Sequence, residues 1–315
     1  MAATRLTIAY TGTLQRESYP DFYDKSMDLF LKRPENVVMI NGQFFTDRDS
    51  ATRVFDMTEY GVVLDMPITA DDTDPRPKTQ PAAGYNKQVT CISKRNSVEI
   101  TKTFKKEDVS GGKAMEMLNG LPASMKKWTE YAMADVFNTG TTTAGSDGSN
   151  LYATDHYHSD PRGGTWSNYE TAGDLTTAAF DTMRVSMINR KDEKGHVMTI
   201  KMNKIMVNPL FEGVAKRVIN SELLPGTANN DINPWQGTVQ IVVNPYLTDT
   251  DQWFGFGDLP EENSGLHMVW FERPNVTGLN LPSDSYPRVI AGFEGALVGA
   301  AAGSILYNSH VNIGA

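Results

Sequence analysis

The sequence contains very little cysteine: Cys91 is the only one in 315 residues. A single cysteine excludes an intramolecular disulfide and a zinc site built from four cysteines. Such sparing use is typical of chains that work in a reducing compartment, where disulfides are rare. Cys91 lies inside a predicted strand with no histidine close to it in sequence. We therefore interpret it as a buried or half-buried small residue and not as a catalytic thiol.

The sequence also lacks the common signatures of nucleotide-binding and hydrolytic enzymes. It contains no G-x-x-x-x-G-K-[ST] phosphate loop, no G-x-G-x-x-G dinucleotide pattern and no G-x-S-x-G nucleophile elbow. Long basic tracts are absent too: the net charge is −9, and the basic residues are scattered apart from short clusters such as those at 102–106 and 126–127. Strong autonomous binding of nucleic acid is therefore not expected. A contact with DNA would need local basic patches that offset phosphate repulsion.

No stretch has the apolar length of a membrane span. Residues 1–12 lack the apolar core of a signal peptide. Residues 289–307 are rich in alanine, glycine and aliphatic side chains, but they include Glu294 and are dominated by small residues. A membrane helix needs about 20 strongly apolar residues, so we predict no contact with a membrane.

The composition is that of a globular protein. With 40% hydrophobic residues and 26 glycines, the chain can bury a substantial core in one large domain or two. The clearest series of elements begins at residue 174. A helix is predicted over 176–190, because apolar side chains recur at the spacing of one buried face, namely Phe180, Met183 and Met187. The charged segment 191–195, which ends in a glycine, is predicted to terminate this helix.

A strand and a second helix are predicted to follow. Residues 198–207 are rich in β-branched side chains that nearly alternate, which favours a strand. Asn208 and Pro209 have the residue types of an N-cap and of a first helical position. Residues 239–245 predict a short buried strand. The apolar residues of the second helix are Leu210, Val214 and Val218 on one side, and Phe211, Ala215 and Ile219 on a neighbouring side.

Five segments of this part of the chain resemble a known family. In order, they are LYATDHYHSD, LTTAAFDTMRVSMINRKDEKG, MTIKMNKIMVNPLFEGVAKRVINS, VQIVVNPYL and QWFGFG. They are similar to the major head subunit of Mu-like phages and prophages, the gpT-like family, over residues 150–256. The resemblance implies a non-catalytic major capsid protein with the α+β Hong Kong 97-type coat fold. That fold combines an N-terminal arm, an extended β-hairpin loop, a peripheral domain with a long spine helix, and an apical domain.

The resemblance also implies a division of the chain into five parts. We expect an N-terminal arm, an extended hairpin loop, a peripheral domain with the spine helix, an apical domain, and C-terminal strands that return to the core. In that order, these parts are residues 1–56, 57–108, 109–205, 206–286 and 287–315. Within the arm, residues 21–31 predict a short helix and residues 36–45 a strand.

The extended loop is predicted from two β-type runs, residues 86–93 and 97–104, on either side of a turn at 94–97. A polar segment with three prolines, 69–84, precedes them and cannot be a central strand or helix. Since a two-stranded ribbon is marginal alone in water, it would need a partner surface. The resemblance places this loop across a neighbouring coat subunit, and an ordinary meander at a sheet edge is the alternative. The candidate assembly contacts are Gln88, Thr90, Ile92, Arg95, Val98 and Ile100.

Residues 111–139 form the longest predicted helix. Gly120 and Pro122 predict a break or kink in it, and Gly140 follows where a C-terminal cap belongs. Order along the chain identifies this helix with the spine of the coat fold. Gly120 and Pro122 are then candidates for a bend that changes between precursor and mature shell. Helical spacing relates four apolar residues of the second half: Met125, Trp128, Ala132 and Val136.

A long turn-rich loop is predicted at 221–237, and such loops are often functional. By resemblance, apical loops surround the axis of each capsomer; a plain surface loop is the alternative. Residues 252–256 and 267–272 predict strands, and residues 288–308 predict strand-like runs broken by glycines. The candidate contacts of the apical loop are Asn229, Asn230, Asp231 and Trp235.

One motif, within the loop-rich insert 141–173, has residues suited to chemistry. Two histidines two apart on a strand point the same way, and a carboxylate can complete a metal site. We expect a polar loop with two solvent-facing histidines, and we keep a metal-dependent hydrolase as the alternative. The remaining histidines, His196, His267 and His310, lie in no recognisable ligand motif. The motif consists of Asp155, His156, His158 and Asp160.

We therefore predict a structural protein, not an enzyme, with neither cofactor nor metal. It would be a major capsid subunit that self-assembles into the icosahedral shell around phage DNA. The expected partners are other copies of itself in hexamers and pentamers, scaffold, portal and decoration proteins, and packaged double-stranded DNA through non-specific contacts. The expected location is the virion capsid, after assembly in the cytoplasm of the host bacterium. Another self-assembling structural protein, such as a tail tube or a surface layer, is a further alternative.

Overall fold

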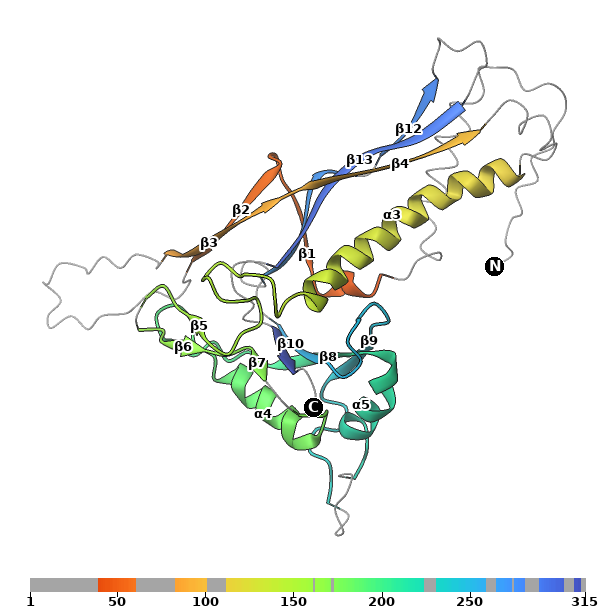
Figure 1. The fold of residues 1–315 in the computed structure, drawn as a ribbon. Helices are drawn as coiled ribbons and strands as arrows, with labels where there is room; N and C mark the ends of the chain where they lie inside the picture. The colour runs from red at the N-terminus through yellow and green to blue at the C-terminus, as the bar shows by residue number, and fades with distance from the viewer. Residues whose placement is uncertain are drawn as a thin grey trace, which may run out of the picture. The chain divides into compact units, whose positions relative to one another are not determined.

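The structure is a computed structural model (Figure 1). The structure describes residues 39–60, 83–100, 112–160, 162–170, 173–223, 231–258, 265–273, 275–280, 289–302 and 309–312. The chain divides into two compact units. The described parts of the first unit lie within 95–125 and 274–294, and the second unit contains 39–94, 126–273 and 295–315.

A five-stranded sheet forms the centre of the second unit, with the strand order β7-β14-β10-β8-β9. The central strand β10 pairs antiparallel with β14 and with β8, whereas β8 and β9 run parallel. All five residues of β10 are buried, because the sheet is covered on both faces. The strands are β7 (Tyr169–Glu170), β8 (Met202–Val207), β9 (Gln240–Val243), β10 (Trp253–Gly257) and β14 (Ser309–Asn312).

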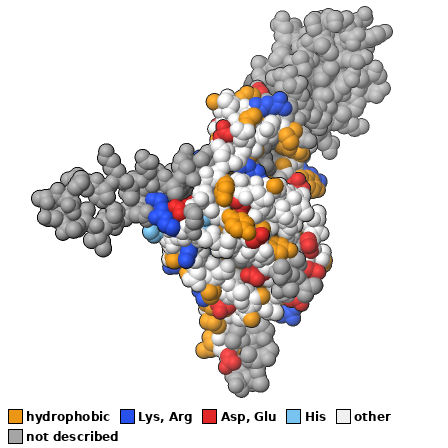
Figure 2. Space-filling view, turned by 60° about the vertical axis from the view of Figure 1, so that its left-hand side comes forward, with side chains coloured by type: hydrophobic (Ala, Val, Ile, Leu, Met, Phe, Trp, Pro, Cys, Tyr) orange, Lys and Arg blue, Asp and Glu red, His pale blue; other side chains and the backbone are white. Residues whose placement is uncertain are grey.

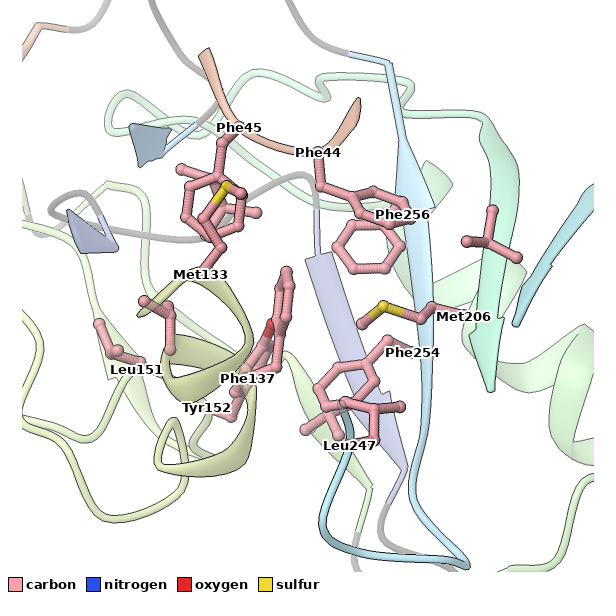
Figure 3. Close-up of a cluster of buried hydrophobic side chains, with 14 of the residues drawn as sticks. Phe44, Phe45, Met133, Phe137, Leu151, Tyr152, Met206, Leu247, Phe254 and Phe256 are labelled. Carbon is pink, nitrogen blue, oxygen red and sulfur yellow. The ribbon is translucent and has the colours of Figure 1, made fainter. Parts of the chain in front are cut away.

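Two hydrophobic clusters lie against this sheet, one on each face, since successive strand residues point to opposite faces. Phe254 and Phe256 of β10 belong to one cluster, and Trp253 belongs to the other. Figure 3 shows the first cluster, in which Phe254 and Phe256 lie near Phe137 of helix α3 (Gly112–Asn138). The ring centroid of Phe137 lies 5.4 Å from that of Phe254 and 5.7 Å from that of Phe256.

The second cluster confirms the helix predicted at 176–190. Helix α4 (Thr177–Ile188) buries its three expected apolar residues, and Thr176 caps it by accepting a hydrogen bond from the backbone N–H of Ala179. Gly255 of β10 permits the close approach of this helix. A Cβ there would stand 2.6 Å from the sulfur atoms of Met183 and Met202. The predicted turn at 191–195 is also present, with Gly195 at a φ of 87°.

The strand predicted over 198–207 is shorter than expected. It begins at Met202, because the chain turns at Thr199, whose φ of 51° is incompatible with a strand. Asn208 and Pro209 do start a helical segment, first as the short 3₁₀ turn η3 (Pro209–Phe211) and then as helix α5 (Glu212–Ile219). The predicted strand at 239–245 is present as β9, but it is a half-exposed edge strand and not a buried one.

A second sheet has the order β1-β11-β13-β12, with β4 also paired to β13. In the second unit, β1 (Thr46–Asp49) runs parallel to β11 (Leu266–Glu272), and β11 pairs with residues 297–302 of β13 (Val289–Ala302). In the first unit, β12 (Asn275–Asn280) pairs with residues 289–294 of β13. The predicted extended conformation near the C-terminus is confirmed over β13. The glycines do not interrupt this strand, because partners pair with it through them.

The predicted hairpin with a turn at 94–97 is wrong. Strand β3 (Ala83–Thr90) pairs antiparallel with β2 (Val54–Tyr60) in a separate two-stranded ribbon. Strand β4 (Ile92–Ile100) continues through residues 94–97 and pairs with β13. A strand partner almost two hundred residues away therefore outweighs the local turn signal of Lys94-Arg-Asn-Ser97.

Two further expectations concern the beginning of the chain and helix α3. The strand expected at 36–45 is wrong for its described part, where Asn41–Gln43 form the 3₁₀ turn η2. The turn forms here because Asn41 is held by Glu130. The backbone N–H and the side-chain amide of Asn41 both donate to the Glu130 carboxylate. The helix expected at 21–31 lies outside the described residues. Helix α3 itself is present and continuous through Gly120 and Pro122, so the expected break does not occur.

Candidate assembly surfaces

The exposed face of the β2–β3 ribbon contains two of the predicted contact residues. Gln88 and Thr90 are exposed, and Ile92, just beyond the ribbon, is 59% exposed. Alternation along the strand explains this arrangement, because the intervening Val89 and Cys91 are buried. Cys91 is thus the buried small residue expected from the sequence, and its thiol lies 3.8 Å from the carbonyl oxygen of Val269.

The opposite face of the ribbon has only a small core of its own. Met57 and Val89 are buried there, with the half-buried Phe55 beside them. Lys87 fastens β3 to the neighbouring loop by donating a hydrogen bond to the carbonyl oxygen of Ala144, at 2.7 Å. Burial lowers the pKa of Lys87, and the charge of Asp147 opposes that shift.

The other four predicted contacts of this group, Ile92, Arg95, Val98 and Ile100, lie on β4. Strand β4 belongs to the sheet of β13, so these residues do not share a ribbon with Gln88 and Thr90. The structure describes the backbone of residues 93–100 and not their side chains. The six residues expected on one hairpin are therefore divided between two sheets.

The predicted apical contacts are only partly placed. Asn229 and Asn230 lie outside the described residues, and Asp231 is exposed. Trp235 is half-buried and packs on α4, with its ring 6.1 Å from that of Phe180 and 4.1 Å from the guanidinium carbon of Arg184. Its indole therefore contacts the body of its own subunit. This partner could not be found from the local sequence, since Arg184 lies on a different element.

A buried asparagine, which the sequence analysis missed, anchors the end of this loop. The Asn233 side chain donates to the carbonyl oxygens of Val218 and Ser221, at 2.8 and 3.1 Å, and accepts from the Trp235 N–H at 3.1 Å. Next to it, Ile232 is 77% exposed. The loop therefore combines a fixed base with an exposed apolar side chain.

The two candidates for a spine bend lie inside helix α3. Gly120 is exposed, and a Cβ added there would have no atom within 4 Å. Pro122 has no N–H to donate, so the carbonyl group one turn earlier lacks its usual helical partner. The helix thus contains a local weakness in its hydrogen bonding at these residues although it remains continuous.

The two histidines of the insert are buried, which corrects the expectation that they face solvent. His156 is 1% exposed and His158 is 7% exposed. The Nδ1 atom of His156 lies 2.7 Å from Asp147 Oδ2, its Nε2 lies 3.0 Å from Asn168 Oδ1, and its ring stacks on Trp166. Both histidines do point to the same side of the chain, as their spacing predicts, because Trp166 contacts both rings.

Different partners hold the other members of this motif. His158 Nδ1 lies 3.5 Å from Glu193 Oε1. Burial alone would raise the pKa of Glu193, but hydrogen bonds from His158 and Ser159 outweigh it and leave that pKa below its usual value. Asp160 pairs with Arg162, whose hydrogen bonds lower the pKa of that carboxyl to about 2. The described part of the chain contains no group of three or more His, Cys, Asp or Glu side chains placed to hold a metal ion.

Figure 2 shows hydrophobic, acidic and basic side chains interspersed over the described part of one face, without a broad basic area. Within the residues that the structure describes, no helix is long and apolar enough to cross a membrane. The fold of the described residues is therefore an α+β fold with an exposed β-ribbon.

Comparison with known families identifies the class more closely. The family model described as "Phage capsid protein" matches residues 92–281, which is more than half of the chain. The chain belongs to this phage capsid protein family. It is a major capsid protein, and its place is the virion capsid. No curated protein sequence matches the chain.

Solved structures share the fold at low sequence identity. The capsid of the native GTA particle has a TM-score of 0.55 and 8% identity, with 100% of this chain and 96% of that chain covered. The bacteriophage JBD30 capsid has a TM-score of 0.56 and 15% identity, with coverage of 69% and 94%. Mycobacterium phage Patience has a TM-score of 0.55 and 12% identity, with coverage of 94% and 88%. These neighbours support the capsid fold and add nothing about individual residues.

Proposed function

We propose that this protein is the head subunit of a Mu-like phage or prophage and adopts the Hong Kong 97-type coat fold. Copies would assemble through rings of five and six into a closed icosahedral shell around double-stranded DNA. Heterologous contacts that close into rings can build such a shell. Membership of the capsid protein family, together with the exposed ribbon, is what supports this proposal.

The ribbon would extend the hold of one subunit on another. It has one exposed face with Gln88 and Thr90, and the described side chains on its other face form a small cluster of Phe55, Met57 and Val89. A two-stranded ribbon is marginal by itself in water. We infer that its exposed face is completed by a neighbouring subunit, as the extended loop of the coat fold would be.

Other parts of the proposal follow from the fold class. The loop at 221–237, with Asn229, Asn230, Asp231 and Trp235, would lie near the axis of a ring. Gly120 and Pro122 would allow α3 to bend between a precursor and a mature shell; a helix that is straight and identical in both states would contradict this role. Scaffold, portal and decoration proteins would be further partners, and assembly would take place in the host cytoplasm.

The division of the chain into arm, extended loop, peripheral domain, apical domain and C-terminal strands also remains a proposal. One boundary needs adjustment under it. A limit between residues 205 and 206 would cut through β8, which runs from Met202 to Val207. A boundary outside this strand would keep β8 in one part.

Negative-stain electron microscopy of the purified protein, over several protein and salt concentrations, tests the proposal. Closed shells or rings of five and six are expected. Ile92→Glu should prevent them, because it places a charge on the exposed apolar side chain that lies just beyond the ribbon, whereas Val185→Glu on α4, also at an exposed apolar position, should not. Tubes or flat sheets would contradict the capsid shell, and normal shells from Ile92→Glu would contradict the role of the ribbon.

A further inference from the structure

The sequence Val-Asn-Pro occurs twice in the central sheet, at the ends of two adjacent strands. Strand β8 ends with Val207 and continues into Asn208-Pro209-Leu210, and β9 ends with Val243 and continues into Asn244-Pro245-Tyr246. The strands are parallel, and Val207 is paired with Val243. Both turns therefore leave the sheet at the carboxyl ends of neighbouring strands. They start one strand spacing apart, which is about 4.8 Å.

Each asparagine fixes its own turn in the same way. Asn208 Oδ1 accepts a hydrogen bond from the Leu210 N–H at 3.1 Å, and Asn244 Oδ1 accepts from the Tyr246 N–H at 3.0 Å. Their amide groups donate elsewhere, from Asn208 to the carbonyl oxygen of Leu247 and from Asn244 to Asn41 Oδ1. Because both asparagines are buried, the two turns are rigid where they leave the sheet.

These rigid turns expose apolar side chains. Leu210 is 74% exposed, Pro209 and Pro245 are exposed, and Tyr246 is half-buried. Tyr246 packs edge-on against Tyr131 of α3, which is itself 52% exposed, with 5.1 Å between ring centroids. The twin-turn ledge is defined here as Tyr131, Pro209, Leu210, Pro245 and Tyr246. Single exposed apolar residues are ordinary, but several on one rigid surface mark an interaction site.

We propose that the twin-turn ledge is a contact surface for a second copy of this chain. The inference rests on the proposed assembly and assigns it a surface separate from the ribbon and from the loop at 221–237. The size of the ledge supports this occupant. Five side chains offer roughly a few hundred Å², whereas a stable pairwise complex buries about 800 Å² on each partner. Such a small contact is effective where each copy is held by several neighbours at once.

Charged side chains near the ledge also favour a contact between two copies of the chain. Lys127 lies 5.9 Å from the Tyr131 ring centroid on the α3 side and is exposed. Asp249, which follows the turn after β9, is exposed as well. Exposed residues of opposite charge near one surface allow a head-to-tail contact, in which Lys127 of one copy faces Asp249 of the next.

The first test compares Leu210→Glu with Val197→Glu, a charge introduced at another exposed apolar residue of the same unit. Thermal unfolding of the free subunits should be the same as in the wild type, since both side chains are exposed. Sedimentation and microscopy should show at least about tenfold fewer assembled subunits for Leu210→Glu, which corresponds to about 1.4 kcal/mol. Assembly of Val197→Glu should remain within about twofold of the wild type on the same scale.

The second test locates the contact directly. Leu210→Cys and Val197→Cys, each labelled with a benzophenone maleimide, are irradiated within assembled shells; the native chain, whose Cys91 is buried, controls for labelling. We expect many cross-links between subunits from position 210 and few from position 197. Three outcomes would overturn the proposed role of the ledge. They are normal assembly of Leu210→Glu, equal cross-linking from both positions, and cross-links from position 210 only to a different protein. A wild-type chain that forms no shells would instead overturn the proposed assembly, and the ledge with it.

Discussion

The central sheet and the β2–β3 ribbon differ in how they are stabilised. The sheet has apolar clusters on both faces, and its middle strand β10 is buried at every residue. The ribbon has two strands, one exposed face, and a cluster of Phe55, Met57 and Val89 on the other face. The sheet is therefore stable within one subunit, whereas a two-stranded ribbon is marginal by itself in water.

This difference separates stability from assembly. Substitutions in the central clusters should unfold the subunit, since each removes packing that nothing else replaces. Substitutions in the ribbon should leave the free subunit folded, because a weakly packed element opens without global unfolding. The substitutions below test that separation, beginning with the largest expected effect.

Phe137→Ala should destabilise the free subunit by about 3–5 kcal/mol, as is typical of a deeply buried phenylalanine. Phe137 is fully buried and contacts the rings of Phe44, Phe254 and Phe256. Phe55→Ala in the ribbon is the matched control and should cost less than about 1 kcal/mol. Urea unfolding followed by tryptophan fluorescence measures both. Equal losses would remove the distinction between sheet and ribbon.

Acid should lower the free energy of unfolding of the subunit, because it protonates the buried His267 of β11. Burial, helped by the charge of Arg48, lowers the pKa of His267 to about 4. The unfolded chain binds this proton near pH 6.5, so the stabilisation is complete above that pH and is lost as the pH falls toward 4. The loss should be roughly 1–3 kcal/mol.

His267→Gln should therefore flatten the dependence of unfolding free energy on pH between about 6.5 and 4. Urea unfolding at several pH values measures this slope. The ribbon variant Phe55→Ala, which keeps His267, provides the control and should retain the wild-type slope. A slope unchanged by His267→Gln would show that other groups are responsible.

Asn208→Ala should cost about 1–2 kcal/mol, because it removes an N-cap and the donor to Leu247. Thr176→Ala, which removes the cap of α4 alone, is a suitable comparison and should cost about 1 kcal/mol. Calorimetry of the free subunits gives both values. A larger loss from Thr176→Ala would mean that the buried amide of Asn208 contributes little.

Val89→Ala should have the smallest effect on the free subunit, below about 1 kcal/mol, yet it should reduce shell formation. The side chain supports the ribbon from its inner face, and the ribbon's exposed face is the one proposed to contact a neighbour. Unfolding of the free subunit and microscopy of assembled material measure the two effects separately. Reduced stability with unchanged assembly would reverse the roles assigned to the two regions.

Local patterns predicted the elements that depend on local sequence. The spacing of Phe180, Met183 and Met187 was sufficient for α4, and Asn208-Pro209 marked the start of η3 and α5. The turn at 94–97 was predicted wrongly because β4 pairs with a distant strand, and pairing of that kind overrides local turn preference. Leu210 was assigned to a helix face, but the 3₁₀ turn before α5 exposes it.

The surfaces were harder to predict than the elements. The burial of His156 and His158 depends on Asp147, Trp166 and Glu193, which no spacing rule connects to the motif. The two Val-Asn-Pro segments are visible in the sequence, but only the paired register of β8 and β9 brings them together. Side-chain partners from separate elements are the information that a single sequence lacks.

Hydrogen–deuterium exchange of the free subunit and of the assembled shell tests the central claim most directly. Amides of β8 and β10 should be strongly protected in both states, because the body is complete in one subunit. Amides of β2 and β3 should exchange quickly in the free subunit and at least about tenfold more slowly in the shell. A ribbon as protected as β10 before assembly, or one that gains no protection on assembly, would contradict the account.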